Sequence, residues 1–264
     1  MENLVILGII IFVVAFSSAF INSLIGGGYG TLATPWLILI GLEPLEFIPS
    51  LLLTHGLMSL FLILIVRRNF KNGTICEFKE ECFYEKTALK YLVSFGVVGL
   101  ILSMLIINYV NSVFIKFYIG MLTIFLGIAL YLLRKKRIHF SKSKMIGVSI
   151  VAAFNKGISG GGYGTVISCG QILSGIHCKK AVSTSYYAET IISIIGFGLY
   201  ILLLKTIIPW EITIFMLLGV FFAIPFAMKS FEKVSNRSIT FIISVILLIL
   251  GIFIVFQAST SIIF

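Results

Sequence analysis

Long apolar runs alternate with short polar segments along almost the whole chain. Stretches without a charged residue cover residues 3–42, 47–66, 91–115, 117–133 and 238–264. Several of them exceed the roughly 18 apolar residues that a helix needs to cross the hydrocarbon core of a bilayer. The pattern therefore predicts an all-α polytopic membrane protein, and it leaves no stretch for a separate soluble domain.

Two glycine-rich segments interrupt these apolar runs. Residues 26–31 and 160–165 both have the sequence Gly-Gly-Gly-Tyr-Gly-Thr, and residues 19–31 and 153–165 share 8 of 13 positions at an offset of 134. Each glycine costs about 1 kcal/mol in a helix relative to alanine, so a helix is expected to break in each segment. Paired breaks in a duplicated membrane protein indicate a substrate site.

The duplication predicts two repeats with the same elements. The first repeat, residues 1–133, has a broken hairpin at 3–42 and membrane spans at 47–66, 88–107 and 113–133. The second repeat, residues 145–264, has a hairpin at 145–175 and spans at 181–204, 209–228 and 239–262. Residues 134–144 form a basic cytoplasmic linker. After each break, the apolar piece that starts at Thr31 or Thr165 is too short to cross a membrane and is predicted to be a half-helix.

Basic residues indicate how the chain is threaded. If each hairpin enters and leaves on one side, the segments 67–90, 134–144, 177–180 and 229–237 share a face and hold 17 of the 20 Lys and Arg residues. Lys and Arg in short loops favour the cytoplasm. Three spans then separate the hairpins, so the repeats are inverted, and the chain is expected to be a multi-pass protein of the cytoplasmic membrane with both termini outside.

Composition supports this class and narrows the chemistry. The chain is 59% hydrophobic and 11% charged, with a mean hydropathy of +1.13. The net charge of +10 lies in the loops, where it sets topology, so no nucleic-acid partner is expected. The four cysteines form no CxxC pair and have no His partner at ligand spacing, so no metal or cofactor is predicted. Without a nucleophile motif, an enzyme is disfavoured.

The motifs resemble the duplicated signature of the TauE/SafE sulfite exporter family, also called the TSUP permeases. The resemblance is carried by the first glycine segment with Pro35, Gly41 and Pro44, and by Gly160–Gly162, Gly175 and the Ala-Val-Ser-Thr-Ser run at 181–185. It implies transport of sulfite, sulfonates or related anions across the cytoplasmic membrane. Two departures concern the substrate: Cys169 stands where the first repeat has Pro35, and residues 50–56 lack an Ala-x-x-Thr-Ser run.

The glycine segments and their flanks are the candidate substrate site. Half-helices that start at Thr31 and Thr165 would direct unpaired N–H groups and a positive dipole end toward an anion. Alternatives are that the threonines are ordinary N-caps and that the glycines serve close helix packing. The predicted substrate-binding residues are Asn22, Gly26, Gly27, Gly28, Tyr29, Gly30 and Thr31, with Lys156, Ser159, Gly160, Gly161, Gly162, Tyr163, Gly164 and Thr165.

Ionisable residues inside apolar spans are candidates for coupling or gating. Lys156 lies about 18 Å into the membrane by helical rise from Lys144, where a charge needs a function or a partner. Glu189 either pairs with Lys156 or relays a proton, and its flanking Tyr186 and the nearby Thr184 join the coupling set. His55 matches Glu189 at the offset of 134, and it is either a coupling residue or a core histidine.

These features predict a secondary transporter for a small anion, such as sulfite, a related sulfur oxyanion, an organosulfonate or a carboxylate. Alternating access of the inverted repeats would move the anion, with a proton or sodium as the coupling ion. The alternative is a cation channel, because Gly-Tyr-Gly also occurs in potassium filters; there, four copies ring the ion. The expected partners are the anion and the lipid bilayer, and a homodimer is left open.

Overall fold

The chain is helical throughout its described part. A computed structural model describes residues 2–25, 27–71, 86–133, 142–173, 178–230 and 236–263. Within these residues there are ten helices and no strand, which confirms the all-α class. The helices are α1 (Glu2–Ile25), α2 (Tyr29–Leu39), α3 (Pro44–Lys71), α4 (Lys86–Ile107), α5 (Ser112–Leu133), α6 (Lys142–Ser159), α7 (Tyr163–Leu173), α8 (Cys178–Leu204), α9 (Trp210–Ser230) and α10 (Asn236–Ile263).

Six helical segments of the described residues are long and apolar enough to cross a membrane. They are Val5–Ser23, Pro44–Ile65, Lys86–Ile107, Ser112–Ala129, Val182–Leu204 and Trp210–Ala227. Large apolar side chains such as Leu64, Phe125 and Phe253 are exposed on the outside of the bundle. Lipid chains can cover such a surface, whereas exposing this much apolar area to water is unfavourable. The chain is therefore a polytopic membrane protein.

A short helix begins inside each glycine segment, at its tyrosine. Helices α2 and α7 have 11 residues each and start at Tyr29 and Tyr163, two residues before the predicted starts at Thr31 and Thr165. The residues just before them, Gly28 and Gly162, have φ values of 119° and 85°, a region that glycine adopts without steric cost. Gly28 caps α2 without a side-chain hydrogen bond. Glycine, rather than threonine, therefore sets the start of each half-helix.

Helices from the two parts of the chain interleave. The most extensive contacts pair α1 with α9, α4 with α6, α3 with α8 and α5 with α10. Glycines allow three of these pairs to approach closely, among them α5 and α10, where a Cβ on Gly251 would lie 2.9 Å from the Gly120 carbonyl oxygen. A Cβ on Gly99 of α4 would lie 3.0 Å from the carbonyl carbon of Ile150, and one on Gly219 of α9 would lie 2.6 Å from the Phe12 carbonyl oxygen. Such backbone contact is typical of helix packing in membranes.

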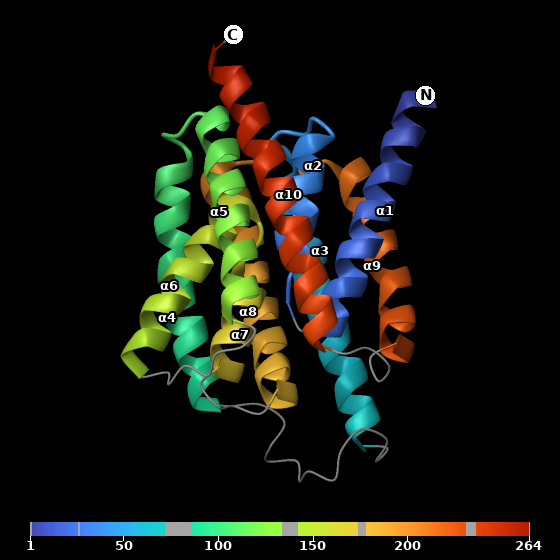
Figure 1. The fold of residues 1–264 in the computed structure, drawn as a ribbon, viewed down its shortest axis with the longest axis vertical. Helices are drawn as coiled ribbons and strands as arrows, with labels where there is room; N and C mark the ends of the chain where they lie inside the picture. Colours follow the sequence, from blue (N-terminus) through green and yellow to red (C-terminus); the bar gives the residue numbers. More distant parts are fainter. Residues whose placement is uncertain are drawn as a thin grey trace.

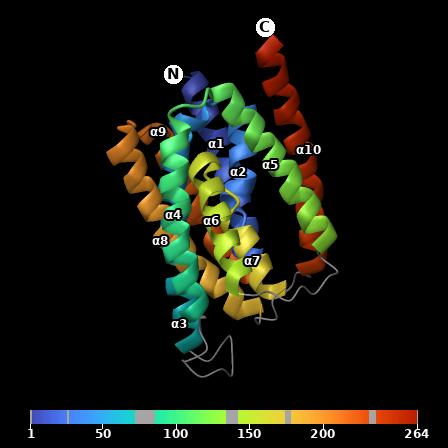
Figure 2. The ribbon, with the colours of Figure 1, turned by 90° about the vertical axis from the view of Figure 1, so that its left-hand side faces the viewer.

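Both ends of the chain lie at one end of the bundle. Figure 1 shows the start of α1 and the end of α10 at the top, and Figure 2 shows the same from the side. Helix α6 starts at the opposite end and runs upward, whereas α1 runs downward. The two helices thus reach the middle of the molecule from opposite ends, and the glycine segments lie there.

Candidate functional site

The two glycine segments touch each other. A Cβ on Gly30 would lie 2.7 Å from Cα of Gly161, and a Cβ on Gly161 would lie 2.6 Å from the Gly30 carbonyl oxygen. These distances are too short for any side chain, and the neighbouring atoms are backbone atoms that have no rotamer to change. Glycine is therefore required at both positions by the contact itself, and the first break packs directly on the second.

Two hydrogen bonds join the broken helices across this contact. The Gly162 N–H donates to Oγ1 of Thr31 at 2.9 Å, and the Thr34 hydroxyl donates to the Ser159 carbonyl at 2.6 Å. On the second segment, the Gly161 N–H donates to Oγ of Ser159 at 3.2 Å. All these side chains are buried. The irregular backbone is thus satisfied by hydroxyl groups, as membrane burial requires.

A small pocket lies beside the contact. Its lining comes from both broken helices and from α5: Gly30, Thr31, Thr34, Pro35, Ile119, Leu122, Thr123, Leu126, Ser159, Gly161 and Gly162. It has room for roughly one water molecule, about 10 Å³. These lining residues are uncharged, and their polar atoms are hydroxyls and backbone groups. The pocket is polar but neutral, and a ligand larger than about one water molecule requires its walls to move apart.

The N-terminus of α2 is already occupied by a side chain. The Tyr29 N–H donates to Oδ1 of Asn22 at 3.0 Å, and the Tyr29 hydroxyl lies 3.2 Å from Oγ1 of Thr54. Asn22 also directs its amide nitrogen toward Sδ of Met58, 4.0 Å away. Asn22 therefore caps the half-helix across the break and does not line the pocket. The backbone N–H of Tyr29, at the helix end that was predicted to face an anion, already donates to the Asn22 side chain.

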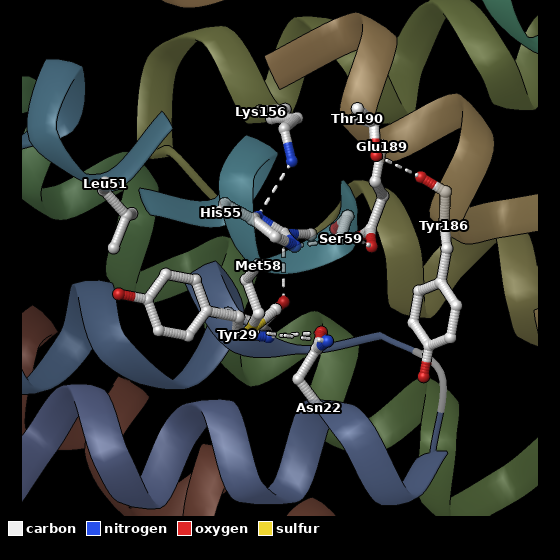
Figure 3. Close-up of polar contacts among 12 residues, drawn as sticks. Asn22, Tyr29, Leu51, His55, Met58, Ser59, Lys156, Tyr186, Glu189 and Thr190 are labelled. Carbon is white, nitrogen blue, oxygen red and sulfur yellow. Dashed lines mark hydrogen bonds and ion pairs between the residues drawn. The ribbon is translucent and has the colours of Figure 1, made fainter. Parts of the chain in front are cut away.

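Lys156 does not line the pocket either; it belongs to a row of three ionisable side chains (Figure 3). Its Nζ lies 3.0 Å from Nδ1 of His55, and Nε2 of His55 lies 3.2 Å from Oε1 of Glu189. The second distance is that of an ion pair, although its geometry falls short of a hydrogen bond. The structure thus places His55 between the two groups that the sequence suggested as direct partners.

Glu189 of α8 packs against two other helices, α7 and α3. A Cβ on Gly164 would lie 2.5 Å from Cδ of Glu189, so the carboxyl group rests against the first turn of α7. The hydroxyl of Ser59 on α3 donates to its Oε2 at 3.4 Å. A helix N-terminus attracts negative charge, so α7 favours the ionised carboxylate. Gly164 acts here by leaving room for Glu189 and not by contacting the pocket.

Among the remaining candidates, two tyrosines hydrogen-bond to backbone carbonyls of other helices. Tyr163 donates its hydroxyl to the Leu92 carbonyl at 3.0 Å, and Tyr186 donates to the Ser23 carbonyl at 3.4 Å. Thr184 is buried, as are Gly27, Gly28 and Gly160. Gly26 lies outside the described residues, and so does the side chain of Thr165.

Sequence reasoning missed several residues at this site. Thr34 follows Thr31 by three positions on the half-helix, so helical spacing could have placed both hydroxyls on one face. Ser59 of α3 follows His55 by four positions, so the same helical spacing could have placed it beside the ionisable row. Thr123 of α5 had no such signal, because it is the one Ser or Thr in the apolar stretch 117–133 and no predicted site residue lies on its helix. Tertiary packing alone brings Thr123 to the pocket.

These features define a class of protein: a helical membrane transporter with two broken helices that meet inside the bundle. The family model described as Sulfite exporter TauE/SafE matches residues 11–254. The chain belongs to this family of transporters, which confirms the resemblance seen in the motifs. Comparisons with curated proteins and with solved structures gave no match.

Proposed function

We propose that the protein is a secondary carrier of a small anion, such as sulfite, a related sulfur oxyanion, an organosulfonate or a carboxylate. The anion binds between the two glycine segments, and two inverted repeats provide access to it from either side of the cytoplasmic membrane in turn. Membership of the sulfite exporter family supports an anion as the substrate. The position of the two helix breaks in the middle of the bundle supports a binding site between them.

The hydrogen bonds between the broken helices carry this proposal. The Gly162 N–H and the Thr34 hydroxyl hold the contact closed by donating to oxygen atoms of the opposite hairpin. When the hairpins separate, an oxyanion between them can replace those oxygen atoms as the acceptor. Hydroxyls and backbone N–H groups, without a fixed cation, can bind an anion and still release it. In this proposal, the pocket of about 10 Å³ is the part of the binding site that remains while the two hairpins are in contact.

The helix pairs support two inverted repeats. By their order along the chain, α1 corresponds to α6, α3 to α8, α4 to α9 and α5 to α10. The offset of 134 holds for the ends of α1 and α6 and for the starts of α3 and α8, whereas α9 and α10 start 124 residues after α4 and α5. Exchanging the repeats turns the α1–α9 pair into the α6–α4 pair, and it maps the α3–α8 and α5–α10 pairs onto themselves. A two-fold relation between the repeats would produce this pattern, and alternating access requires such a relation.

The test is flux into proteoliposomes of the purified protein. Sulfite, thiosulfate, methanesulfonate and acetate are compared with potassium and sodium. Selective, saturable anion flux is expected, whereas selective cation flux would favour the channel alternative and overturn the proposal.

The variant Thr34→Val tests whether the anion binds between the two glycine segments. Thr34→Val keeps the shape of the side chain and removes the donor, so KM should rise about tenfold, since a hydrogen bond to an ion is worth roughly 1.5 kcal/mol. Ser149→Ala is the matched control, because that buried hydroxyl only donates to the Met145 carbonyl of its own helix. An unchanged KM in Thr34→Val would place the anion elsewhere.

A further inference from the structure

Three ionisable side chains form a continuous buried row on three different helices. Lys156 of α6 and Glu189 of α8 are 0% exposed, and His55 of α3 is 2% exposed. The two ring nitrogens of His55 face opposite chemistry, an ammonium group at 3.0 Å and a carboxylate at 3.2 Å. Figure 3 shows His55 between the other two side chains. None of the three residues lines the pocket.

We propose that the Lys156–His55–Glu189 row binds a proton that is transported together with the anion. The protein would then move one proton with each monoanion, without net charge. This inference rests on the proposed anion transport and adds the coupling ion and its site.

The charge of the row supports the coupling. With Lys156 protonated, His55 neutral and Glu189 ionised, the row is neutral; one more proton, on His55 or on Glu189, makes its charge +1. A buried charge without a counterion is costly, so the protonated row favours an anion close by. Since coupling between two binding sites is reciprocal, the anion favours the proton to the same extent.

The proton site and the pocket lie close together along two chain segments. Ser159, which lines the pocket, follows Lys156 by three residues on α6. Thr31, which also lines the pocket, follows Tyr29 by two residues, and the ring centroid of Tyr29 lies 5.3 Å from that of His55. A separation of the hairpins therefore moves groups of both sites at once.

Among the described residues, the other titratable side chains around the row are phenols. Tyr29 comes from α2, Tyr163 starts α7 with its ring centroid 5.7 Å from Nζ of Lys156, and Tyr186 lies on α8 one turn before Glu189. Phenols stay neutral near pH 7, so they do not supply the change in charge. That change falls to Lys156, His55 and Glu189.

A proton fits this site better than sodium does. Hard cations prefer shells of about six oxygen ligands. Among the described contacts of Glu189, Ser59 supplies one hydroxyl oxygen, and an imidazole and an ammonium group occupy the same cluster. Within the described residues, no group of three or more His, Cys, Asp or Glu side chains could hold a metal ion.

The experiment separates anion exchange from proton-driven accumulation. Proteoliposomes are loaded with radiolabelled sulfite, thiosulfate or methanesulfonate, and exchange is measured at equal pH on both sides. Accumulation is then measured with the outside one pH unit more acidic and the membrane potential clamped at zero; protein-free vesicles correct for passive entry. A trapped pH dye records proton entry. The wild type, His55→Gln, Glu189→Gln and the Ser149→Ala control are compared.

Wild type and Ser149→Ala should accumulate the anion about tenfold at a difference of one pH unit and take up protons with it. His55→Gln and Glu189→Gln should lose this accumulation while retaining exchange. Exchange by the wild type without proton entry, or accumulation that needs sodium, would overturn the inference and leave anion transport intact. Full accumulation in both variants would also overturn it, and loss of exchange in both would assign these residues to the anion instead. Absence of exchange by the wild type would defeat the proposed function itself.

Discussion

Gly30→Ala tests the contact between the two broken helices. A Cβ at this position would lie 2.7 Å from Cα of Gly161 and 2.9 Å from the carbonyl carbon of Gly160, and it would lie closer still to the Gly160 oxygen. Ordinary carbon contacts need about 3.5–4.0 Å, so the hairpins must separate by roughly 1 Å. Forcing a methyl group into a packed interior costs typically 1–3 kcal/mol.

The assay is thermal unfolding of the purified protein in detergent. For a chain of this size, 1 kcal/mol shifts Tm by roughly 2–4 °C, so Gly30→Ala should lower Tm by about 2–12 °C. Gly198→Ala of α8 is the matched control, because a Cβ there meets no atom within 4 Å, and alanine favours a helix by about 1 kcal/mol. If Gly30→Ala unfolds at or above the temperature of Gly198→Ala, the glycine segments are not packed on each other, and the reasoning is refuted.

Two further predictions concern single carboxylates. Gly164→Ala should displace the Glu189 carboxyl group, since a Cβ would lie 2.5 Å from its Cδ; proton-driven accumulation should fall, and full accumulation would contradict the contact. At Glu43, in the turn between α2 and α3, partial burial acts to raise the pKa, but hydrogen bonds from Lys116 and Ser112 and the charge of Lys116 outweigh it, so the pKa of Glu43 is lowered. A pKa that is lower in the folded state stabilises the protein above the ordinary value of 4.5, and this stabilisation is lost as the pH falls through the folded value. Tm of wild type should therefore exceed that of Glu43→Gln at pH 7 by an amount worth about 1 kcal/mol or less, and the two curves should converge as the pH is lowered below 4.5. Parallel curves would contradict the pairing.

Much of the architecture was predictable, because a membrane-spanning helix needs a long run of apolar residues and its ends are marked by polar or charged residues. Apolar runs predicted the spans, and the described helices extend beyond the predicted bounds by only a few residues, as α3 does from 47–66 to Pro44–Lys71. The glycine triplets predicted the two breaks. The starts of the half-helices were wrong by two residues, because the positive φ of Gly28 and Gly162 already permits a helix at the following tyrosine.

The site was less predictable, because a sequence offset gives equivalence and not proximity. The offset of 134 makes His55 equivalent to Glu189 and Asn22 equivalent to Lys156. The contact in the structure instead joins Lys156 to His55, which are members of two different equivalent pairs. Likewise, Gly164 was predicted as part of an anion site, and its contact is with Glu189. Such contacts depend on how α3, α6 and α8 pack, which no local pattern records.

One difference between matching positions bears on the direction of transport. Asn22 accepts the first N–H of α2, whereas Lys156, its counterpart, has no acceptor atom and instead contacts His55. If the repeats exchange conformations, the two open forms differ in chemistry, because only one hairpin carries a cation next to its break. The carrier would then rectify: its two faces would have unequal apparent affinities for the same anion, so identical gradients of opposite sign would drive unequal initial rates.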